Sequence, residues 1–362
     1  MAANVSNSVA ATDGQLYTDG PVPLHERVVE ACILFVVGAV ALAGNLLLML
    51  TVCRLRHLRS VSNCLILCLV TADILVAVIN VPFGVSAIAA GAWPHGDNVC
   101  RAVGFTNMTF FVASVMSLGS ISVNRYVCIC HPSKAKDIYT PRNAFLVSLG
   151  VWLLALTLAA PPLLGWGKYG YIPGQSLCFC QWKTSISYTF LMLGMCFGGP
   201  CVAMGFSYSN IIRHVRASKR RLKTGPECDS VLVTVSGAAA TRQGNPQAVS
   251  SVNRQHLKQN DKMQKAKRKE RQNEMRLTRT FFVVIATFVV CWLPYCIAML
   301  WSLFSPYPVP RGVDISSILL GYFNSCCNPI IYGIMNVNFR DGYKVILCCR
   351  KHGRTGILVS TL

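Results

Sequence analysis

Residues 60–93 read SVSNCLILCLVTADILVAVINVPFGVSAIAAGAW, a stretch in which Asp73 is the only charged side chain. A charge at the centre of a bilayer costs roughly 2.5–3.5 kcal/mol on insertion scales, so long uncharged runs are candidate membrane spans. Further runs without Asp, Glu, Lys or Arg have the length of about 20 residues that crosses a hydrocarbon core: Ala31–Cys53, Ala102–Asn124, Asn143–Gly167, Thr184–Ile212, Thr280–Pro310 and Ile315–Phe339. Because backbone in lipid must satisfy its own hydrogen bonds, these runs predict helices.

The composition supports the same interpretation. Of the 362 residues, 53% are hydrophobic and 13% are charged, whereas soluble domains carry roughly a quarter charged residues. Core helices of a large soluble protein are the alternative explanation, and so many long runs argue against it. We therefore predict an all-α membrane protein: a seven-transmembrane helix bundle over residues 31–339, followed by a short amphipathic C-terminal helix.

The basic residues predict how the chain is threaded. Seventeen of the 34 Lys and Arg residues lie between Arg213 and Arg279, and the net charge is +20. By the positive-inside rule this segment is cytoplasmic, so residues 1–30 are extracellular and residues 340–362 form a cytoplasmic helix end and tail. The charge then faces anionic lipid, and we expect no nucleic-acid partner. The predicted location is the plasma membrane, as a multi-pass protein with its N-terminus outside.

The loops and termini carry weaker signals. Residues 213–279 form the third cytoplasmic loop, expected to be partly disordered because 224–260 is rich in Gly, Ser, Gln and Asn, with 262–279 extending the sixth helix. Asn4 begins a glycosylation sequon. Cys348 and Cys349 follow an amphipathic basic stretch and are predicted palmitoylation sites. Ser360–Leu362 matches a PDZ ligand pattern.

Two groups of polar residues lie where lipid would not tolerate them. Asp73 needs partners in neighbouring helices, and candidates are Ser114, Asn324, Ser325 and Asn328. Together they predict an oxygen-rich pocket for Na⁺, with a polar network that holds helices together as the alternative.

Arg125 directly follows the third run. Glu274, at the start of the predicted sixth helix, is its natural counter-charge. Breaking that pair would free the sixth helix, unless Arg125 merely extends to the interface.

Cysteines near the outer face predict a disulfide. Cys100 begins the third run on the outer face, and Cys178 and Cys180 lie in the outer loop between the fourth and fifth. One disulfide from Cys100 is expected in the oxidising exterior, to either of the two, with Cys178 preferred. The sequence has no phosphate-binding glycine loop, no metal-spaced His/Cys set and no Gly-x-Ser-x-Gly motif. We therefore predict that the protein is not an enzyme.

An ordered set of short motifs resembles the rhodopsin-like (class A) G-protein-coupled receptors. The set is Gly44-Asn45, Leu69-Val70-Thr71-Ala72-Asp73, Cys100, Asn124-Arg125-Tyr126, Trp152, Pro200 with Tyr208, Cys291-Trp292-Leu293-Pro294 and Asn328-Pro329-Ile330-Ile331-Tyr332. The resemblance implies a ligand pocket between the outer helix halves, a heterotrimeric G protein at the inner face, and arrestin and receptor kinase as further partners. It also implies a Na⁺ site at Asp73 and a switch through Trp292, Phe288, Arg125, Tyr208 and Tyr332.

Within that family the chain looks most like melatonin receptors, through Ile129-Cys130-His131 and Tyr322-Phe323-Asn324-Ser325-Cys326. It departs from them where Cys196 stands for a histidine and Pro162 for an asparagine, so melatonin is not the expected ligand. Asn107 stands where aminergic receptors have an aspartate, and Tyr322 where opsins have a lysine. These positions favour a small, neutral or weakly polar ligand, contacted by residues that the resemblance places around the pocket: Asn107, Trp182, Lys183, Cys196, Trp292 and Tyr322. Coupling to Gi/o is implied by the same resemblance.

Three alternatives stay open. Lys183 could bind a carboxylate, which suits a receptor for a medium-chain fatty acid. A membrane transporter or channel would share the seven spans, although it would need several intramembrane ionisable residues along a pathway. The chain could also act by restraining another receptor in a dimer.

Overall fold

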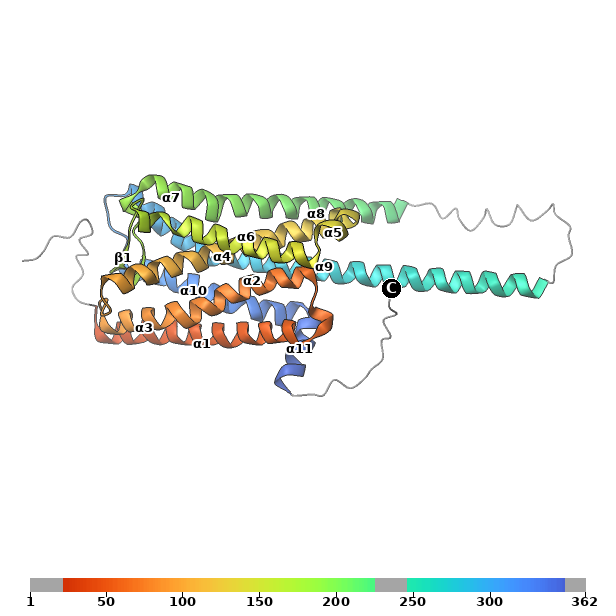
Figure 1. Cartoon of the computed structure of the whole chain (residues 1–362), viewed down its shortest axis with the longest axis horizontal. Coiled ribbons are helices and arrows are strands. Elements are labelled where there is room, and N and C mark those ends of the chain that lie inside the picture. Colours follow the sequence, from red (N-terminus) through yellow and green to blue (C-terminus); the bar gives the residue numbers. More distant parts are fainter. Residues whose placement is uncertain (1–21, 225–245, 349–362) are drawn as a thin grey trace, which may run out of the picture.

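The computed structural model describes the backbone of residues 22–224 and 246–348, and the side chains there except that of His57 and most of those between 218 and 274. Long helices lie side by side in a bundle (Figure 1). A hairpin lies at one end of the bundle. At the other end a short helix turns across it, and two helices, α8 and α9, extend beyond it.

Seven helical segments within the described ranges are long and apolar enough to cross a membrane, so the predicted seven-helix bundle is confirmed. They are α1 (Leu24–Arg54), α2 with η2 and α3 (Val61–Leu75, Val76–Asn80, Val81–Ala90), α4 (Asp97–Cys130), α6 with η3 (Pro141–Ala159, Pro161–Leu164), α7 with η5 and α8 (Ile186–Leu193, Gly194–Gly198, Gly199–Thr224), α9 (Pro246–Phe304) and α10 (Arg311–Met335). Short helices η1 (Arg56–Leu58), α5 (Pro132–Ile138) and η4 (Trp182–Thr184) lie in the connections, and α11 (Val337–Leu347) follows α10.

Local signals set several helix starts. The Ser60 hydroxyl accepts the backbone N–H of Asn63 at 3.3 Å, and the Thr140 hydroxyl accepts that of Asn143 at 3.3 Å. These side chains satisfy donors that a helix start leaves unpaired. At the far end of α3, Gly91 adopts φ +71°, a left-handed conformation that glycine takes at little cost.

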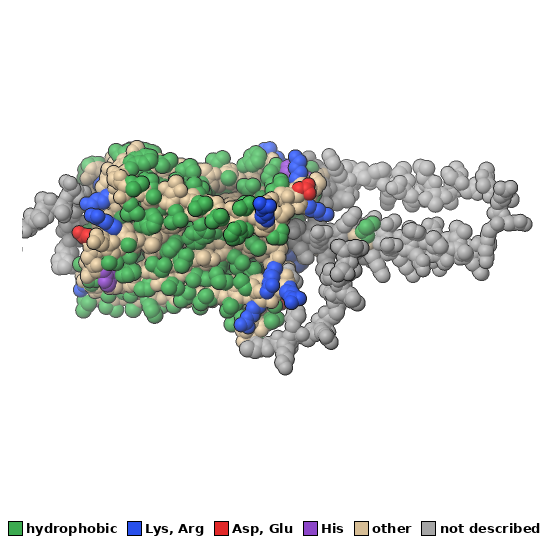
Figure 2. Space-filling model, in the orientation of Figure 1, with side chains coloured by type: hydrophobic (Ala, Val, Ile, Leu, Met, Phe, Trp, Pro, Cys, Tyr) green, Lys and Arg blue, Asp and Glu red, His purple; other side chains and the backbone are tan. Residues whose placement is uncertain are grey.

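The surface of the bundle fits lipid as its solvent. In the view of Figure 2 hydrophobic side chains cover its middle, and Lys and Arg side chains gather at its ends. Large apolar side chains point outward, including Val202 at 73% exposure and Phe145 at 68%. Such a belt would be an aggregation hazard in water, so the chain is a multi-pass membrane protein.

Two helix boundaries differ from the sequence-based expectation. α1 begins at Leu24, so the helix includes Glu26, Arg27 and Glu30, which the uncharged run left in the N-terminal segment. Charged side chains at a helix end reach the aqueous interface, so a helix continues beyond its uncharged part.

α9 begins at Pro246, so residues 246–260 are helical where an irregular loop was expected. Proline is suited to a first helical position, and no glycine occurs between Pro246 and Phe304.

One disulfide and several hydrogen bonds fix the hairpin to the bundle. β1 (Tyr169–Ile172) pairs antiparallel with β2 (Leu177–Cys180), with Tyr169 opposite Cys180. Cys178 forms the disulfide with Cys100 of α4, their Cα atoms 5.3 Å apart, which confirms the preferred pairing; Cys180 is a buried free thiol. The Tyr169 hydroxyl donates to the Ala159 carbonyl at 2.7 Å.

At the opposite end α11 packs against α1 and α10. Phe339 is fully buried, and the Tyr343 hydroxyl donates to the Pro329 carbonyl at 3.1 Å. Gly342 lies so close to Thr51 that a Cβ there would overlap it. The predicted C-terminal helix is thus confirmed, and Cys348 is exposed just after it. Asn4, Cys349 and Ser360–Leu362 lie outside the described residues, so glycosylation, palmitoylation and PDZ binding stay predictions.

Candidate ligand cavity and switch

A cavity of about 40 Å³ lies beneath the hairpin, between the helices. That volume holds about three water molecules, since one needs roughly 10–15 Å³. Strand β2 contributes to its walls together with α2, η2, α4, α9 and α10. The lining residues are Asp73, Val76, Asn107, Phe110, Phe111, Ser114, Leu177, Phe179, Trp292, Ile318, Gly321, Tyr322, Asn324 and Ser325.

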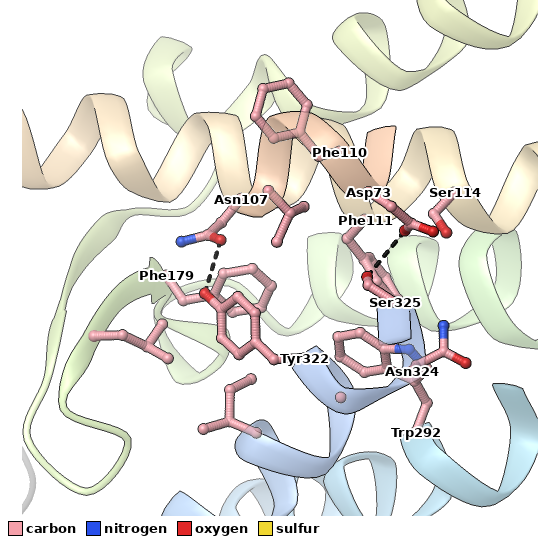
Figure 3. A pocket seen from close by; sticks show the side chains of 14 residues that line it. Asp73, Asn107, Phe110, Phe111, Ser114, Phe179, Trp292, Tyr322, Asn324 and Ser325 are labelled. Atoms are coloured by element: carbon pink, nitrogen blue, oxygen red, sulfur yellow. Dashed lines mark hydrogen bonds between the residues drawn. The ribbon is translucent and has the colours of Figure 1, made fainter. Parts of the chain in front are cut away.

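Two polar side chains meet across the end of the cavity nearest the hairpin. The Tyr322 hydroxyl of α10 donates to Oδ1 of Asn107 on α4 at 3.0 Å, and Figure 3 shows the two side chains pointing toward each other beside Phe179. The Asn107 amide donates in turn to the Cys178 carbonyl at 3.3 Å. Helix α10, helix α4 and strand β2 are therefore joined by one chain of hydrogen bonds.

Trp292 forms the aromatic floor of this region. Its ring centroid lies 4.5 Å from that of Phe111 on α4, 5.8 Å from Tyr295 and 6.4 Å from Phe288. Gly321 lets the indole lie against α10, because a Cβ there would lie 3.0 Å from the ring. Pro294 lies two residues along the same helix and removes a backbone hydrogen bond. The indole therefore lies beside a point where α9 can bend.

A second polar cluster lies deeper in the cavity, around Asp73. Its carboxylate accepts the Ser325 hydroxyl at 2.9 Å and the Asn328 amide at 2.7 Å, both from α10. Ser114 and Asn324 line the same space, and Figure 3 shows Ser114 beside the carboxylate. The structure thus brings together all five residues predicted to surround Na⁺.

The donor set around Asp73 fits a small hard cation. Na⁺ prefers oxygen ligands, and this cluster offers carboxylate, hydroxyl and amide oxygens. Among the described residues, the side-chain oxygens of Asn324 and Asn45 are buried without a hydrogen-bond partner. A buried acceptor left unpaired is costly, so such oxygens are suited to a cation or ordered water.

The predicted switch residues lie toward the other end of the bundle. Arg125 is buried and donates to Oδ1 of Asn124, from Nη2 at 2.7 Å and from Nε at 3.1 Å, and to the Ser62 hydroxyl. Its guanidinium lies 5.5 Å from the centre of the Phe281 ring. The side chain of Glu274 lies outside the described residues, so the Arg125–Glu274 pair stays a prediction.

Tyr208, Phe288 and Tyr332 connect these two regions. The Tyr208 hydroxyl donates to the Thr278 carbonyl and thereby joins α8 to α9. Tyr332 is fully buried against Phe281, 5.8 Å between ring centroids, and Phe288 is buried beneath Trp292. The aromatic side chains form a packed path from the cavity toward Arg125.

Three of the six predicted ligand contacts do not line the cavity. Cys196 is buried among apolar side chains on η5, and Lys183 is exposed on η4. Trp182 lies one layer farther out, where its indole N–H donates to the Tyr295 hydroxyl at 2.9 Å. Leu177, Phe179 and Phe111 do line the cavity and were not predicted. The spacing of Phe179, directly beside the disulfide cysteine, is the signal that could have found it.

The chain is similar to known receptors over most of its length. Residues 44–332 match the family model described as 7 transmembrane receptor (rhodopsin family). The chain is 31% identical to mouse α-1D adrenergic receptor. The match covers 86% of this chain and 55% of that receptor, so the chain spans about half of the receptor's length. It is also 31% identical to mouse melatonin receptor type 1B, covering 87% and 76%. Squid rhodopsin matches in structure with a TM-score of 0.76 and 22% identity, covering 98% of both chains.

Proposed function

Since the chain belongs to the rhodopsin family of seven-transmembrane receptors, we propose that it binds a small, neutral or weakly polar extracellular ligand and activates a heterotrimeric G protein of the Gi/o class. The family is one of receptors rather than enzymes, transporters or channels, and G-protein coupling follows from membership. The ligand class, the G-protein subtype, the plasma membrane location and the outward-facing N-terminus are the proposed parts.

The observation that carries the ligand class is the Asn107–Tyr322 pair, which lies among apolar side chains at the end of the cavity nearest the hairpin. A cationic amine requires a carboxylate at the depth of Asn107, and the only acid in the lining is Asp73, in the deeper cluster. An amide and a phenol can exchange hydrogen bonds with an uncharged ligand, while Phe110, Phe179 and Trp292 cover its apolar part. Ligands lacking a polar group would leave the two side chains paired with each other.

A ligand screen read out by G-protein dissociation tests the proposal. Indoleamines and fatty acids form the first two sets, and each is run with separate Gi/o, Gs and Gq sensors. A ligand that acts through the cavity should lose at least tenfold in potency in Asn107→Leu, at matched surface expression. An ion-flux assay on the same cells is the control: a ligand-gated current without G-protein dissociation would refute the proposal.

The second candidate, a carboxylate lipid, rests on Lys183. This exposed side chain follows Trp182. The ring centroids of Trp182 and the cavity-lining Phe179 are 5.9 Å apart. A medium-chain fatty acid could place its chain toward Phe179 and its carboxylate on Lys183. In that case Lys183→Gln abolishes the response to fatty acids, and Lys168→Gln, an exposed lysine before β1, leaves it intact.

Na⁺ is proposed as an allosteric ion at Asp73. Ser114, Asn324, Ser325 and Asn328 would hold it with the carboxylate, and its charge would offset the buried aspartate. The residues themselves hold the carboxylate in place through the Ser325 and Asn328 donors. Arrestin and a receptor kinase are proposed partners at the inner face, where Arg125 and α9 form the switch.

A further inference from the structure

A groove of about 330 Å³ opens on the outside of the bundle, between η2 with α3 and the first turns of α4. It is separate from the cavity beneath the hairpin, because the two share no lining residue. Sites for small molecules begin at about 300 Å³, so this groove can hold a small molecule or a large part of one.

Two helix faces form the walls of the groove. The residues on α4 recur at intervals of three or four and therefore share one face of the helix: Asn98, Val99, Ala102, Val103 and Thr106. Val99 is 37% exposed and Ala102 is exposed, so this face looks out of the bundle. Ile79 and Phe83, four residues apart, form the opposite wall. The small side chain of Ala102 leaves the hollow between the two faces.

A hydrogen bond between the two helices closes the inner end of the groove. The Thr106 hydroxyl lies 2.9 Å from Oδ1 of Asn80 and 3.0 Å from the Val103 carbonyl, and it donates its hydrogen to these acceptors. Asn80 is buried and ends η2, a single wide turn of π-helix of a kind that is frequent at functional sites. Because the Thr106 donor is already used, a polar ligand group finds its partner at the other end, where Asn98 is exposed.

The length and charge of the groove restrict what can occupy it. From Asn98 to Thr106 the helix rises about 12 Å, at 1.5 Å per residue. That is less than half of a hydrocarbon core of about 30 Å, so the groove lies within one leaflet, with Asn98 near the interface. Among the described residues, none of those that line it is charged. The occupant therefore has an uncharged polar end and an apolar body.

The groove is continuous with the lipid-facing belt of the bundle, so its occupant comes from the membrane. We propose that it binds a sterol, with the sterol hydroxyl at Asn98 and the rings lying over Ala102 toward Thr106. The leaflet is the outer one in the proposed orientation of the chain. An uncharged amide matches an uncharged hydroxyl, whereas phospholipid head groups carry charge. The fused rings are already rigid, so ordering them costs less conformational entropy than ordering a flexible acyl chain.

One turn of α4 separates the groove from the cavity beneath the hairpin. Thr106 lines the groove, and its neighbour Asn107 lines the cavity. Phe83 also packs against the apolar cluster that contains Cys100 and Cys178. A bound sterol thus supports the segment of α4 that presents Asn107, and it stabilises the folded bundle whether or not a ligand occupies the cavity.

Photo-cross-linking locates the sterol. The purified full-length chain is placed in phosphatidylcholine nanodiscs with a photoreactive cholesterol analogue, and labelled peptides are identified by mass spectrometry. Label should appear between Asn98 and Thr106, and excess cholesterol should remove it. Ala102→Trp fills the groove and should reduce this labelling about fivefold or more. Ala39→Trp, at an exposed alanine of α1, is the matched control and should leave it unchanged.

Thermal unfolding in the same nanodiscs gives an independent measurement. Cholesterol should raise the melting temperature of the starting protein and of Ala39→Trp, but not that of Ala102→Trp. Melting of Ala102→Trp in sterol-free nanodiscs shows whether it is folded, and Val99→Phe, a smaller filling, replaces it if it is not. Asn98→Leu should abolish the preference for cholesterol over its 3α-epimer, because the amide that meets the hydroxyl is gone.

Several results would overturn the sterol site. They are label spread evenly over the spans, equal labelling of the filled groove and the α1 control, and equal melting shifts in those two variants. Label in the groove from a photoreactive phosphatidylcholine that cholesterol does not displace would assign it to an acyl chain instead. Neither measurement uses agonist or G protein. A failed ligand screen therefore leaves the sterol site standing, and a failed sterol site leaves the proposed function standing.

Discussion

The Asn107–Tyr322 hydrogen bond offers a quantitative test of the cavity. Tyr322→Phe removes the donor and leaves Oδ1 of Asn107 buried without a partner, which should cost about 1–3 kcal/mol in the free energy of unfolding. Asn107→Leu should cost more, because it leaves two groups unpaired: the Tyr322 hydroxyl and the Cys178 carbonyl. In the double variant only the Cys178 carbonyl is left. The double cost should therefore fall short of the sum of the single costs by two such penalties, about 2–6 kcal/mol.

Equilibrium unfolding of the purified receptor in mixed detergent micelles measures these costs. The denaturing detergent is titrated, helicity is followed, and all four proteins are compared at one protein concentration. Tyr307→Phe, at an exposed tyrosine in the connection before α10, is the control for loss of a hydroxyl. Additivity within about 0.5 kcal/mol would refute the hydrogen bond as a link between α4 and α10.

Three further predictions follow from particular contacts. Glu274→Ala should raise ligand-free G-protein signalling, because Asn124 cannot neutralise Arg125; unchanged basal signalling at matched surface expression would contradict the lock. Asp73→Asn should abolish any effect of Na⁺, relative to K⁺, on agonist affinity in radioligand competition, and a retained Na⁺ effect would place the ion elsewhere. Gly44→Ala should lower the melting temperature, because the added Cβ would lie 2.6 Å from Pro329. Gly119→Ala is the control and should not lower it, because no atom lies within 4 Å of its Cβ. Equal shifts would refute the close approach of α1 and α10.

The number and order of spans could be predicted because each has its own local signal. Lipid excludes charge from every span independently, so an uncharged run identifies a helix without knowledge of its neighbours. The same rule fails at helix ends, as Glu26 and Glu30 of α1 show. There the side chains reach water, and the boundary depends on capping and on contacts such as Glu30 with Arg311.

The site was predictable where its residues are polar and not where they are apolar. Asp73, Asn107 and Tyr322 stand out because burying a polar group in lipid demands a partner. Phe111 carries no such signal, since apolar residues are expected everywhere in a span, and Phe179 is marked only by its position beside Cys178. The choice of Cys178 over Cys180 depends on packing: both lie on β2, but Cys180 sits opposite Tyr169 in the apolar core.

The outer and deeper polar clusters share one cavity, which has a consequence for the proposed ligand and ion. Asn107 and Tyr322 line the same space as Asp73 and Ser325, with Trp292 beside both pairs. A ligand that enlarges this space by displacing Trp292 changes the surroundings of the ion site, so the two affinities are coupled. Thermodynamic reciprocity then requires that if Na⁺ weakens ligand binding by a given factor, the ligand weakens Na⁺ binding by the same factor. The absence of such coupling in a protein that binds both would mean that the indole stays in place when ligand enters.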